Sequence, residues 1–522
     1  MIRLNQIKIN VISGDHESIL DSRIKQMLKI NSYLSYEIVK KSIDARRKPE
    51  LYWVYTVDVA VNDENKVLKK SRCKNATISS DVRYRWPAGE ASKLRPVIIG
   101  MGPAGLFCGY MLAKAGDRPI ICERGQDVDT RTEDVIRFWE TGELNLKSNV
   151  QFGEGGAGAF SDGKLTTLVN DKTGRNKEVL KILVENGAPE NILYDSKPHI
   201  GTDVLKDVVK NIRKAIIAYG GEVRFDHRLI DINNPKDGIL EAVFDNGSVL
   251  TTDALVLAIG HSARDTFEML SKKAIVMMPK PFAVGMRVQH PQSLIDSRQY
   301  GEENLDKKLP ASSYKLTYHD ESGRGVYSFC MCPGGYVVNA SSEPGRLAIN
   351  GMSYNDRDSG VANSAIIVTV TPTDFPGDDP LSGVEFQRRL EEKAYNLANG
   401  LIPYESFKEY KNRQTDDTVI DYRFKGKAAK GAVHELLPEE VSNAFINGME
   451  YFGTVIKGFA DDNAVIAGIE SRTSSPVRIE RDDTYQAKIE GLYPCGEGAG
   501  YAGGIMSAAM DGMLIAEEIW KR

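Results

Sequence analysis

The residues with the clearest chemical pattern are three glycines, Gly100, Gly102 and Gly105. They form a GxGxxG sequence directly after the short apolar run 97–99, at the start of an apolar stretch that continues to about residue 115. A buried strand, a tight glycine turn and a helix in this order are typical of the first half of a β-α-β unit. The pattern predicts that the pyrophosphate of a dinucleotide binds at the N-terminus of the helix.

The next strand supplies a second part of that site. Residues 119–122 are apolar and are followed by Glu123, at about the distance from the glycines that the pattern requires. A carboxylate there accepts hydrogen bonds from both ribose hydroxyls of an adenosine and disfavours a 2′-phosphate. The expected dinucleotide is therefore FAD or NAD rather than NADP. Pro103, Ala104 and Arg124 adjoin these residues and belong to the same predicted site.

Two later segments decide between FAD and NAD. Residues 251–260 are typical of a buried strand ending in a small-residue turn, and residues 492–500 of a strand followed by a glycine-rich loop. The predicted site residues are Ala258 and Gly260 in the first segment, Gly496 and Glu497 in the second, and Gly503, Gly504 and Ile505 at the start of the last predicted helix. With the first glycine pattern, this arrangement resembles the flavoprotein oxidoreductases of the glutathione-reductase structural class.

That resemblance implies FAD as the bound cofactor. In such proteins a late acidic residue bonds to the ribityl chain of the flavin, a role that falls here to Glu497, where the family usually has Asp. The helix that begins at residues 503–505 would point its N-terminus at the pyrimidine edge of the flavin ring. A helix N-terminus is positively polarised, so it stabilises negative charge on the reduced ring.

A closer resemblance is to a bacterial and plastid group of uncharacterised FAD-dependent dehydrogenases, over about residues 95–522. The segments that carry it are Asn149–Leu165, His261–Phe267, Pro281–Gln292, Ser328–Gly335, Asn350–Ser353 and Tyr493–Asp511. This resemblance implies the cofactor and the class of redox enzyme, but it leaves the substrate open.

A second glycine-rich segment, residues 153–158, is expected to be a loop, because it leads into a polar sequence rather than an apolar helix. The resemblance implies that the loop lies against the flavin, with Gly155, Gly156, Ser161, Gly163, Lys164 and Leu165 near the cofactor. A plain glycine-rich turn is the alternative. No second strand–GxGxxG–helix unit follows, so any NAD(P)H would have to visit the substrate side transiently. Arg264 and Lys164 could neutralise pyrophosphate charge, or they could be solvated or ion-paired.

Few residues suggest proton or thiol chemistry, since the flavin itself carries hydride chemistry and the protein supplies orientation and proton handling. His290 ends an apolar strand and could act as a general acid, although a hydrogen-bonded structural histidine is the alternative. Cys330 and Cys332 could form a redox pair, but on a strand they would point the same way without good disulfide geometry. A structural or substrate-facing role is their alternative. The seven histidines form no HxH or HxxxH pair, so no metal site is expected.

The composition excludes several classes of protein. Of the 522 residues, 41% are hydrophobic and 27% are charged, which is ordinary for a soluble globular chain with sizeable cores. No segment approaches the ~18 consecutive apolar residues of a membrane span. The N-terminus lacks a basic-then-apolar leader, and six cysteines are too few for a disulfide scaffold. We expect a reduced, cytoplasmic protein with a small-molecule substrate and no membrane partner.

These elements predict an α/β fold with a discontinuous, Rossmann-like FAD-binding domain formed by residues 95–275 and 465–522. A mainly antiparallel β substrate domain, residues 276–464, is inserted between the two parts, because β-type segments dominate there and one helix, 385–398, interrupts them. A small α+β domain, residues 1–90, precedes both. The residues that could line the substrate side are Asn350, Ser353 and Arg357.

The N-terminal domain differs from the rest in charge. Residues 1–95 contain 19 Lys and Arg against 11 Asp and Glu, a net charge of +8, whereas the remainder contains 48 against 61, a net charge of −13. Strands are expected at residues 4–12 and 51–61, and helices at residues 20–28 and 36–43. Clustered basic residues beside aromatic ones would suit RNA. An ordinary solvated face is the alternative.

The predicted function is FAD-dependent oxidoreduction, in which a hydride passes through flavin N5 to or from an unidentified organic substrate, with NAD(P)H as a possible transient donor. Reduction of carbon–carbon double bonds, as in isoprenoid reductases of similar architecture, is an enzymatic alternative. A flavin-carrying RNA-binding or regulatory protein that works through residues 1–90 is the alternative from another class.

Overall fold

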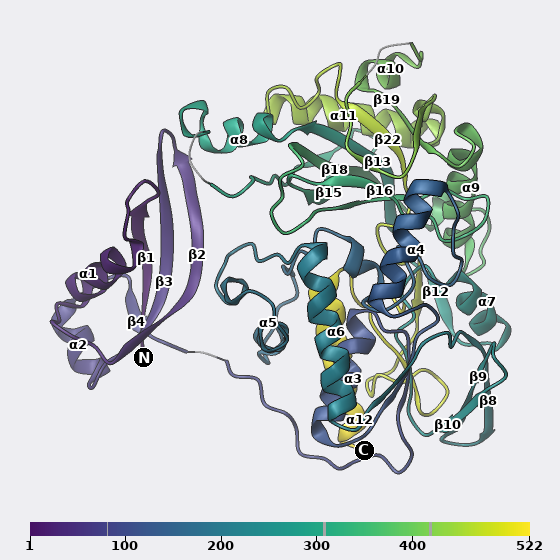
Figure 1. Ribbon diagram of the computed structural model, residues 1–522, viewed down its shortest axis with the longest axis horizontal. Helices are drawn as coiled ribbons and strands as arrows, with labels where there is room; N and C mark the ends of the chain where they lie inside the picture. Colours follow the sequence, from purple (N-terminus) through teal and green to yellow (C-terminus); the bar gives the residue numbers. More distant parts are fainter. Residues whose placement is uncertain (81, 306–308, 417–419) are drawn as a thin grey trace. The chain divides into compact units, whose positions relative to one another are not determined.

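The computed structural model describes residues 1–80, 82–305, 309–416 and 420–522. The chain folds into two compact units (Figure 1). The first unit consists of residues 1–85, 164–199 and 296–310, and the second of residues 86–163, 200–295 and 311–522. Within the described residues, no helix has both the length and the apolar character needed to cross a membrane.

The first 80 residues form a four-stranded sheet with two helices. Its elements are β1 (Ile2–Asn10), α1 (His16–Leu28), β2 (Ser35–Arg47), β3 (Glu50–Ala60), α2 (Glu64–Ser71) and β4 (Ala76–Ile78). The strands pair antiparallel in the order β2-β3-β1-β4, the βαββαβ arrangement of a ferredoxin-like domain. Leu4 of β1, Val57 of β3 and Ile24 of α1 are fully buried in its core. The small α+β domain is therefore present.

The helix predicted over residues 36–43 is wrong. These residues belong to β2, which pairs with β3 from Ser35 opposite Ala60 to Arg47 opposite Glu50. The apolar residues of this segment suit either a helical or an extended period. Its partner strand follows in the chain, so pairing decides the structure rather than local preference.

Two other segments complete the first unit. They contain α5 (Arg175–Glu185), η2 (Glu190–Leu193) and η3 (Glu302–Asn304). The edge strand β2 is extended at Lys41, whose N–H donates to the carbonyl of Tyr194 (2.7 Å) and whose carbonyl accepts from the N–H of Ser196 (2.8 Å). The Asn304 amide donates to the carbonyl of Pro49 (3.1 Å). The N-terminal sheet is thus tied to both later segments by hydrogen bonds.

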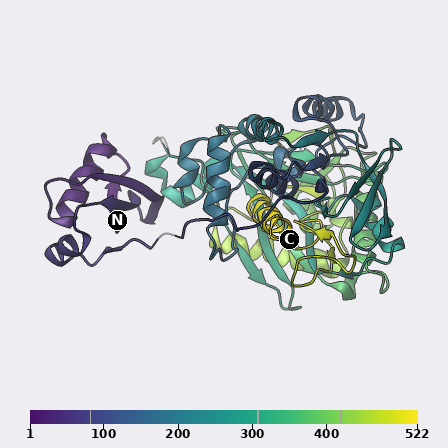
Figure 2. The ribbon, with the colours of Figure 1, turned by 90° about the horizontal axis from the view of Figure 1, so that it is seen from below.

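The second unit contains a five-stranded parallel sheet in the order β24-β11-β5-β6-β7. Its strands are β5 (Val97–Ile99), β6 (Ile120–Cys122), β7 (Glu222–Arg224), β11 (Leu255–Leu257) and β24 (Leu492–Pro494). Helix α3 (Pro103–Ala115) packs against α6 (Thr202–Ala218) and the C-terminal α12 (Ile505–Trp520), as Figures 1 and 2 show. Parallel strands that are buried beneath helices appear in the sequence as short continuous apolar runs. The discontinuous Rossmann-like domain is confirmed.

Smaller elements surround this sheet. They are α4 (Val128–Thr141), η1 (Gly156–Phe160), β8 (Leu229–Lys236), β9 (Ile239–Phe244), β10 (Val249–Thr252), α7 (Arg264–Lys272), and the pair β12 (Met277–Pro279) and β23 (Val477–Ile479). The strands β10-β9-β8 form an antiparallel sheet of their own.

The substrate domain is built on a seven-stranded, mainly antiparallel sheet in the order β14-β15-β18-β13-β22-β19-β21. Its strands are β13 (Phe282–Pro291), β14 (Thr317–His319), β15 (Gly325–Cys332), β18 (Val361–Val370), β19 (Ile402–Ser406), β21 (Ala428–Lys430) and β22 (Val465–Glu470). A second sheet pairs β17 (Ile349–Met352), β16 (Tyr336–Asn339) and β20 (Phe424–Lys425). The helical elements are α8 (Gln292–Tyr300), which runs from one unit into the other, η4 (Pro372–Asp374), α9 (Ser382–Leu397), α10 (Phe407–Asn412), η5 (Val433–Glu435) and α11 (Glu439–Val455).

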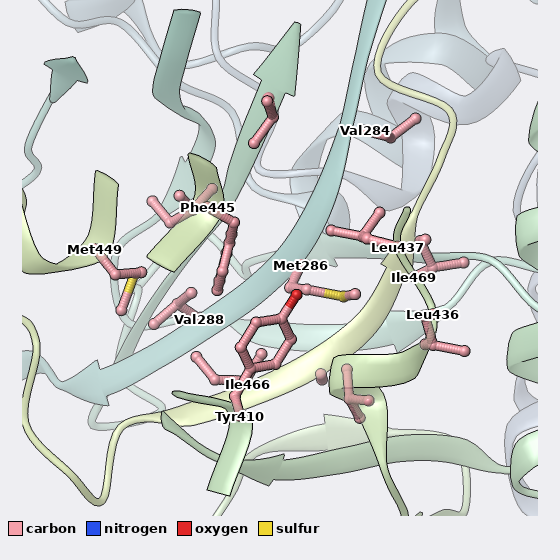
Figure 3. Packing of buried hydrophobic residues seen from close by; sticks show 14 of the residues in the cluster. Val284, Met286, Val288, Tyr410, Leu436, Leu437, Phe445, Met449, Ile466 and Ile469 are labelled. Atoms are coloured by element: carbon pink, nitrogen blue, oxygen red, sulfur yellow. The ribbon is translucent and has the colours of Figure 1, made fainter. Parts of the chain in front are cut away.

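Figure 3 shows the core of this domain, where Met286 of β13 and Ile466 of β22 lie among Tyr410 of α10 and Phe445 of α11. All four side chains are fully buried. Strand β22 pairs with β13 and β19, so it belongs to the substrate sheet. The predicted domain boundary after residue 464 therefore lies too early, because the returning chain first completes this sheet.

Candidate functional site

The glycine fingerprint has the geometry that its sequence predicts. Gly100 has φ +98°, a conformation that favours glycine, and a Cβ atom at position 105 would lie 1.9 Å from the carbonyl oxygen of Gly100. Gly102 is the N-cap of α3 and Pro103 is its first residue. A Cβ atom at position 102 would meet only the Cα of Gly156, at 3.7 Å, among the described residues. A ligand therefore has room to approach the backbone at Gly102, whereas the backbone at Gly105 is already packed against Gly100.

The second glycine-rich segment lies against this fingerprint. The N–H of Gly155 donates to the carbonyl of Met101 (2.9 Å), and a Cβ atom at position 156 would lie 2.8 Å from the Cα of Gly102. A Cβ atom at position 158 would come within 3.1 Å of the Ile505 side chain. The loop therefore joins the N-termini of α3 and α12.

Those two helix N-termini are both capped by glycine. Gly102 caps α3 and Gly504 caps α12, and neither helix has a side-chain hydrogen bond at its cap. Helices α5, α6, α7, α9 and α11 likewise lack a side-chain hydrogen bond at the cap, whereas Asp127 caps α4 and Ser406 caps α10 through side-chain oxygens. Gly503 and Gly504 are exposed, and Cβ atoms there would meet no described atom within 4 Å. Two converging helix N-termini without side-chain caps suit an anionic ligand.

The turns after β11 and β24 complete the cluster. The N–H of Ala258 donates to the carbonyl of Ile99 (2.9 Å), and a Cβ atom at position 498 would lie 2.5 Å from the carbonyl oxygen of Gly260. A Cβ atom at position 496 would lie 2.6 Å from the Cβ of Ala104. These short approaches bring the mid-chain turn and the late loop to the fingerprint.

Glu497 has a partner that the sequence did not suggest. One of its carboxylate oxygens lies 3.0 Å from Nδ1 of His261, and both side chains are partly exposed. The pair stands directly after Gly260 and Gly496. Its place agrees with the predicted ribityl contact, which stays a prediction, and it adds His261 as a neighbouring donor.

Glu123 is held more tightly than expected. It is 4% exposed, and its carboxylate accepts the backbone N–H groups of Met101 (2.8 Å), Gly125 (2.9 Å) and Gly153 (3.0 Å). The carboxylate therefore fixes the fingerprint turn to the second glycine loop. The ribose contact predicted for Glu123 would share its oxygens with these backbone groups.

Arg131 of α4 is a residue that the sequence reasoning missed. It is fully buried, and burial lowers the pKa of its guanidinium to about 10. It donates to five carbonyl oxygens, those of Asn149, Val150, Gly153, Glu154 and Gly156. One arginine thus shapes the loop beside the fingerprint. Backbone carbonyls leave no sequence signature, so no pattern could have revealed this role.

The end of the loop contacts the substrate domain. The Ser161 hydroxyl accepts the N–H of Gly163 (3.1 Å), and a Cβ atom at position 163 would lie 1.8 Å from the carbonyl oxygen of Ile200. Between them Asp162, 1% exposed, accepts hydrogen bonds from the Ser353 hydroxyl and from the Arg357 guanidinium (2.7 Å). Two of the three residues expected to line the substrate side therefore meet the predicted flavin loop.

Three more residues of the predicted site have other contacts. Lys164 and Leu165 belong to the first unit, where Leu165 donates its N–H to the carbonyl of Pro198 (3.0 Å). Their cofactor contacts stay predictions. Arg124 pairs with Asp265 (3.0 Å) and stacks over the Phe152 ring.

The prediction that Arg264 neutralises pyrophosphate charge is wrong, because its guanidinium is used elsewhere. Arg264 is 2% exposed and donates to both oxygens of Glu391 (2.7 and 2.8 Å) and to Glu343 (2.5 Å). Arg472 donates to the same Glu391 carboxylate (2.7 and 2.9 Å). Burial raises the pKa of Glu391, but the two arginines outweigh it and hold that pKa well below its usual range. The ion-paired alternative for Arg264 is the one the structure shows.

His290 and the two neighbouring cysteines have structural surroundings. Nε2 of His290 lies 2.6 Å from the carbonyl of Phe459, and burial lowers the pKa of the imidazole to about 4. This placement favours the structural alternative over general acid catalysis. Cys332 is buried and donates to the carbonyl of Cys330 (3.3 Å), and no disulfide joins any of the six cysteines.

A bulge in β15 separates those cysteines. Cys330 has φ +41°, and its carbonyl accepts from the fully buried Arg287 (2.9 Å). Arg287 also forms two bonds with Glu470 (2.5 and 3.0 Å) and reaches the side chain of Asn350 (3.1 Å). Burial is the largest cause that raises the pKa of the Cys332 thiol. A buried, protonated thiol does not favour redox chemistry.

Comparison with known proteins agrees with this picture. A family model described as "FAD-dependent protein, C-terminal domain-like" matches residues 281–473, and a domain of unknown function, DUF8436, matches residues 1–60. An uncharacterised protein of Clostridium beijerinckii is 46% identical over 99% of this chain and 98% of its own length. The chain belongs to the family of that clostridial protein. The FAD-dependent match supports FAD as the cofactor of the family and oxidoreduction as its class of chemistry.

Solved structures give weaker likenesses. The tetracycline destructase Tet(51) is 11% identical, with a TM-score of 0.34 over 81% of this chain and 80% of its own. Glycine oxidase from Bacillus cereus is 11% identical, with a TM-score of 0.35 over 82% of this chain and 95% of its own. At these scores neither likeness says anything about the substrate of the present family.

The residues present fit an FAD. The two glycine-capped helix N-termini suit its pyrophosphate and the negative edge of its ring, and the open backbone at Gly102 leaves room for close approach. Glu123 binds the fingerprint turn and Glu497 pairs with His261, and these are the carboxylates expected at the ribose and at the ribityl chain. Among the described residues, no group of three or more His, Cys, Asp and Glu side chains could hold a metal ion.

Proposed function

We propose that this protein is an FAD-dependent dehydrogenase or reductase that moves a hydride between flavin N5 and an unidentified organic substrate, with NAD(P)H as a transient donor. The observation that carries the proposal is the meeting of five glycine-containing segments at two helix N-termini without side-chain caps. When bound, FAD supplies the hydride chemistry of the reaction. Within the described residues, the fingerprint at Gly100–Gly105 has no second copy that could serve as a separate NAD(P)H domain.

The chain's own residues would bind and orient the cofactor. The backbone at Gly102 would receive the pyrophosphate, Glu123 the adenosine ribose, and Glu497 with His261 the ribityl chain. The N-terminus of α12, at Gly504, would place its positive end by the ring edge that gains negative charge on reduction. The substrate would approach from the side of the substrate domain, where Ser353 and Arg357 meet Asp162.

The experiment is an anaerobic titration of the FAD-loaded full chain with NADH and then NADPH, followed by the visible absorbance of the flavin. Rapid bleaching by either nucleotide is the expected result. Bound flavin that neither nucleotide bleaches would remove NAD(P)H from the proposal and leave a dehydrogenase with another donor. Failure to bind FAD at all would overturn the proposal. Reduction of carbon–carbon double bonds remains the enzymatic alternative, tested by adding isoprenoid acceptors to the reduced protein.

A second candidate function rests on the N-terminal domain. Five basic side chains on α2 and just after it are exposed, and they form no ion pair among the described residues: Lys66, Lys69, Lys70, Arg72 and Lys74. Such a cluster favours an anionic partner, and RNA is the polyanion that this candidate names. An electrophoretic shift of RNA at low salt, lost on changing these five residues to Gln, is expected if this candidate holds. No shift at low salt would remove it.

A further inference from the structure

The pairing of Arg357 with the predicted flavin loop suggests what part of a substrate this protein recognises. Arg357 follows β17 and donates from Nη2 to Asp162 (2.7 Å), which stands between Ser161 and Gly163. Asp162 lies four residues after Gly158, the residue that contacts the N-terminus of α12. The guanidinium is therefore anchored to the same loop that contacts both helix N-termini.

Asp162 holds Arg357 by a single bond. One carboxylate oxygen of Asp162 accepts from Arg357, and the other accepts from the Ser353 hydroxyl. An arginine paired with one carboxylate alone usually forms two parallel bonds with it. Here the Nη1 and Nε nitrogens of Arg357 make no hydrogen bond to the described part of the chain, and Nε is buried.

Two other buried arginines of the same unit donate hydrogen bonds from all of their nitrogens. Arg287 donates through all three of its nitrogens to two side-chain amides, a carbonyl and Glu470. Arg131 donates through all three nitrogens to backbone carbonyls. Arg357 keeps most of its donors, although its side chain is only 17% exposed. Nη1 of Arg357 thus makes no hydrogen bond to the described chain at a partly buried position, while Nε is enclosed by the protein.

The backbone fixes the direction of this side chain. Arg357 has φ +52°, a left-handed conformation that is uncommon for a residue with a side chain. A Cβ atom at position 334 would lie 1.6 Å from the carbonyl oxygen of Arg357, so only Gly334 permits the two segments to meet. Strained backbone held by its surroundings is frequent where a side chain must be aimed at a ligand.

We propose that Arg357 recognises a carboxylate group of the substrate, while Asp162 holds the guanidinium from the opposite side. This inference rests on the proposed function and names the class of substrate, an organic acid. Nη1 and the second hydrogen of Nη2 form a planar pair of donors at the end of the guanidinium, which matches a carboxylate, and Asp162 balances part of the positive charge. The hydride would then pass to or from a carbon of the acid that the bound carboxylate holds in place.

The test is calorimetric titration of the full chain with acetate, and with acetamide as a neutral molecule of the same shape. The wild type is expected to bind acetate and not acetamide. Arg357→Gln should weaken acetate binding at least about tenfold, and Arg357→Lys, which keeps the charge without the planar fork, should fall between the two. The matched control is Arg389→Gln on α9, an arginine that is 60% exposed beside Glu385, and it should bind acetate as the wild type does.

Several results would overturn the proposal. Acetate and acetamide could bind alike, acetate could fail to bind the wild type, or R357Q could bind acetate unchanged. Tighter binding of inorganic phosphate than of acetate would assign the site to phosphate esters instead. Loss of FAD from R357Q, with its thermal unfolding unchanged, would assign Arg357 to the cofactor. Titrating the chain with and without FAD keeps the two proposals apart, because a wild type that binds acetate but no FAD defeats only the proposed function.

Discussion

Two regions of the second unit are held together by different kinds of interaction. Around the fingerprint, glycines such as Gly105 and Gly156 permit close contacts between backbone atoms, and the buried side chains of Glu123 and Arg131 bind backbone groups. In the substrate domain and at its border, segments are joined by ion pairs between buried side chains, such as Arg287 with Glu470 and Arg264 with Glu391. The first region is proposed to present peptide groups to the pyrophosphate, whereas the second holds its buried side chains in fixed places by ion pairs.

This difference teaches where each region is sensitive. A buried ion pair contributes little net stability over an apolar pair, but it costs much when one partner is removed, because the other charge stays buried. A glycine contact costs much only where a Cβ atom would meet rigid backbone. The two regions therefore fail in different ways, and substitutions can separate them.

The largest effect is expected for Arg287→Leu. The variant leaves the Glu470 carboxylate buried without its partner, so the free energy of unfolding should fall by about 3–5 kcal/mol. The double variant R287L/E470L should recover a large part of that loss, because no charge then remains buried. Urea unfolding of the three proteins measures both values.

The control for this cycle is Arg389→Leu, which removes an exposed pair with Glu385 (3.5 Å) and should change stability by about 0.5 kcal/mol or less. If R287L cost no more than R389L, the substrate domain would not depend on its buried charges. The contrast drawn between the two regions would then be wrong for the substrate domain.

Gly105→Ala is expected to have the next largest effect. The added Cβ would lie 1.9 Å from the carbonyl oxygen of Gly100, so helix α3 must move away from β5, at a cost of about 3 kcal/mol. Gly116→Ala, at the C-terminal end of the same helix, is the matched control. Its φ is +100° but no described atom lies within 4 Å of the new Cβ, so it should cost only about 1 kcal/mol.

Equal losses in G105A and G116A would mean that the close approach of α3 is not what requires glycine. Thermal unfolding without FAD distinguishes these outcomes, because it reports the packing of the helix rather than cofactor binding.

The same comparison explains how much the sequence could predict. Spacing within about 25 residues identified the fingerprint, Glu123 and the helix after it, because each element there contacts its neighbour in the chain. The partners of Arg264 lie 79 and 127 residues away, so its burial against Glu343 and Glu391 was out of reach and a cofactor contact was predicted instead. Residues 36–43 failed for a related reason, since β3 determines their structure.

The glycine-rich segments near the C-terminus could be predicted from the family resemblance but not from their own residue spacing. Gly496, Glu497 and Gly504 reach the fingerprint only after the substrate domain has been completed, and nothing local to them indicates the partner. Arg131 and Asp162 had no such help. Their roles depend on backbone carbonyls and on a loop nearly 200 residues away, which become visible only in three dimensions.

A pH-dependent effect should belong to the substrate domain alone. Glu405 is fully buried beside His434, and burial raises the pKa of its carboxyl from an ordinary 4.5 to about 8. The charge of Glu409 acts in the same direction, and Lys430 acts against it. The folded state therefore keeps a proton that the unfolded state releases above pH 4.5, so stability should fall as the pH rises from about 5 to 8.

The expected slope is at most about 1.4 kcal/mol per pH unit, and Glu405→Gln should remove it, so that the variant gains on the wild type toward pH 8. Glu435→Gln removes an exposed charge that is the smallest of the causes raising this pKa, so it should leave most of the slope in place. Urea unfolding at several pH values measures the slope. A wild-type stability that rises between pH 5 and 8 and an E405Q variant that behaves alike would show that Glu405 is ionised in the folded protein.

The smallest effect on stability, and the sharpest test of the fingerprint region, is expected for Gly102→Ala. The backbone at Gly102 has φ −73°, which alanine adopts freely, and the nearest described atom to the new Cβ is the Cα of Gly156, at an ordinary 3.7 Å. Stability without FAD should therefore change by about 0.5 kcal/mol or less. The methyl group would nevertheless stand at the N-terminus of α3, where the pyrophosphate is expected to approach the backbone most closely.

FAD binding by G102A should accordingly weaken by at least about tenfold while the fold is intact. Fluorescence titration with FAD measures the affinity, and thermal unfolding of the same samples measures the stability. Gly503→Ala, which adds a methyl group at an exposed position just before α12, tests in the same way whether the N-terminus of α12 contacts the cofactor. If both variants bound FAD as tightly as the wild type, the two helix ends would not receive the cofactor, and the glycines there would serve only the packing of the loop. If G102A alone were impaired, α3 would carry the pyrophosphate and α12 would act on the ring without close contact at Gly503.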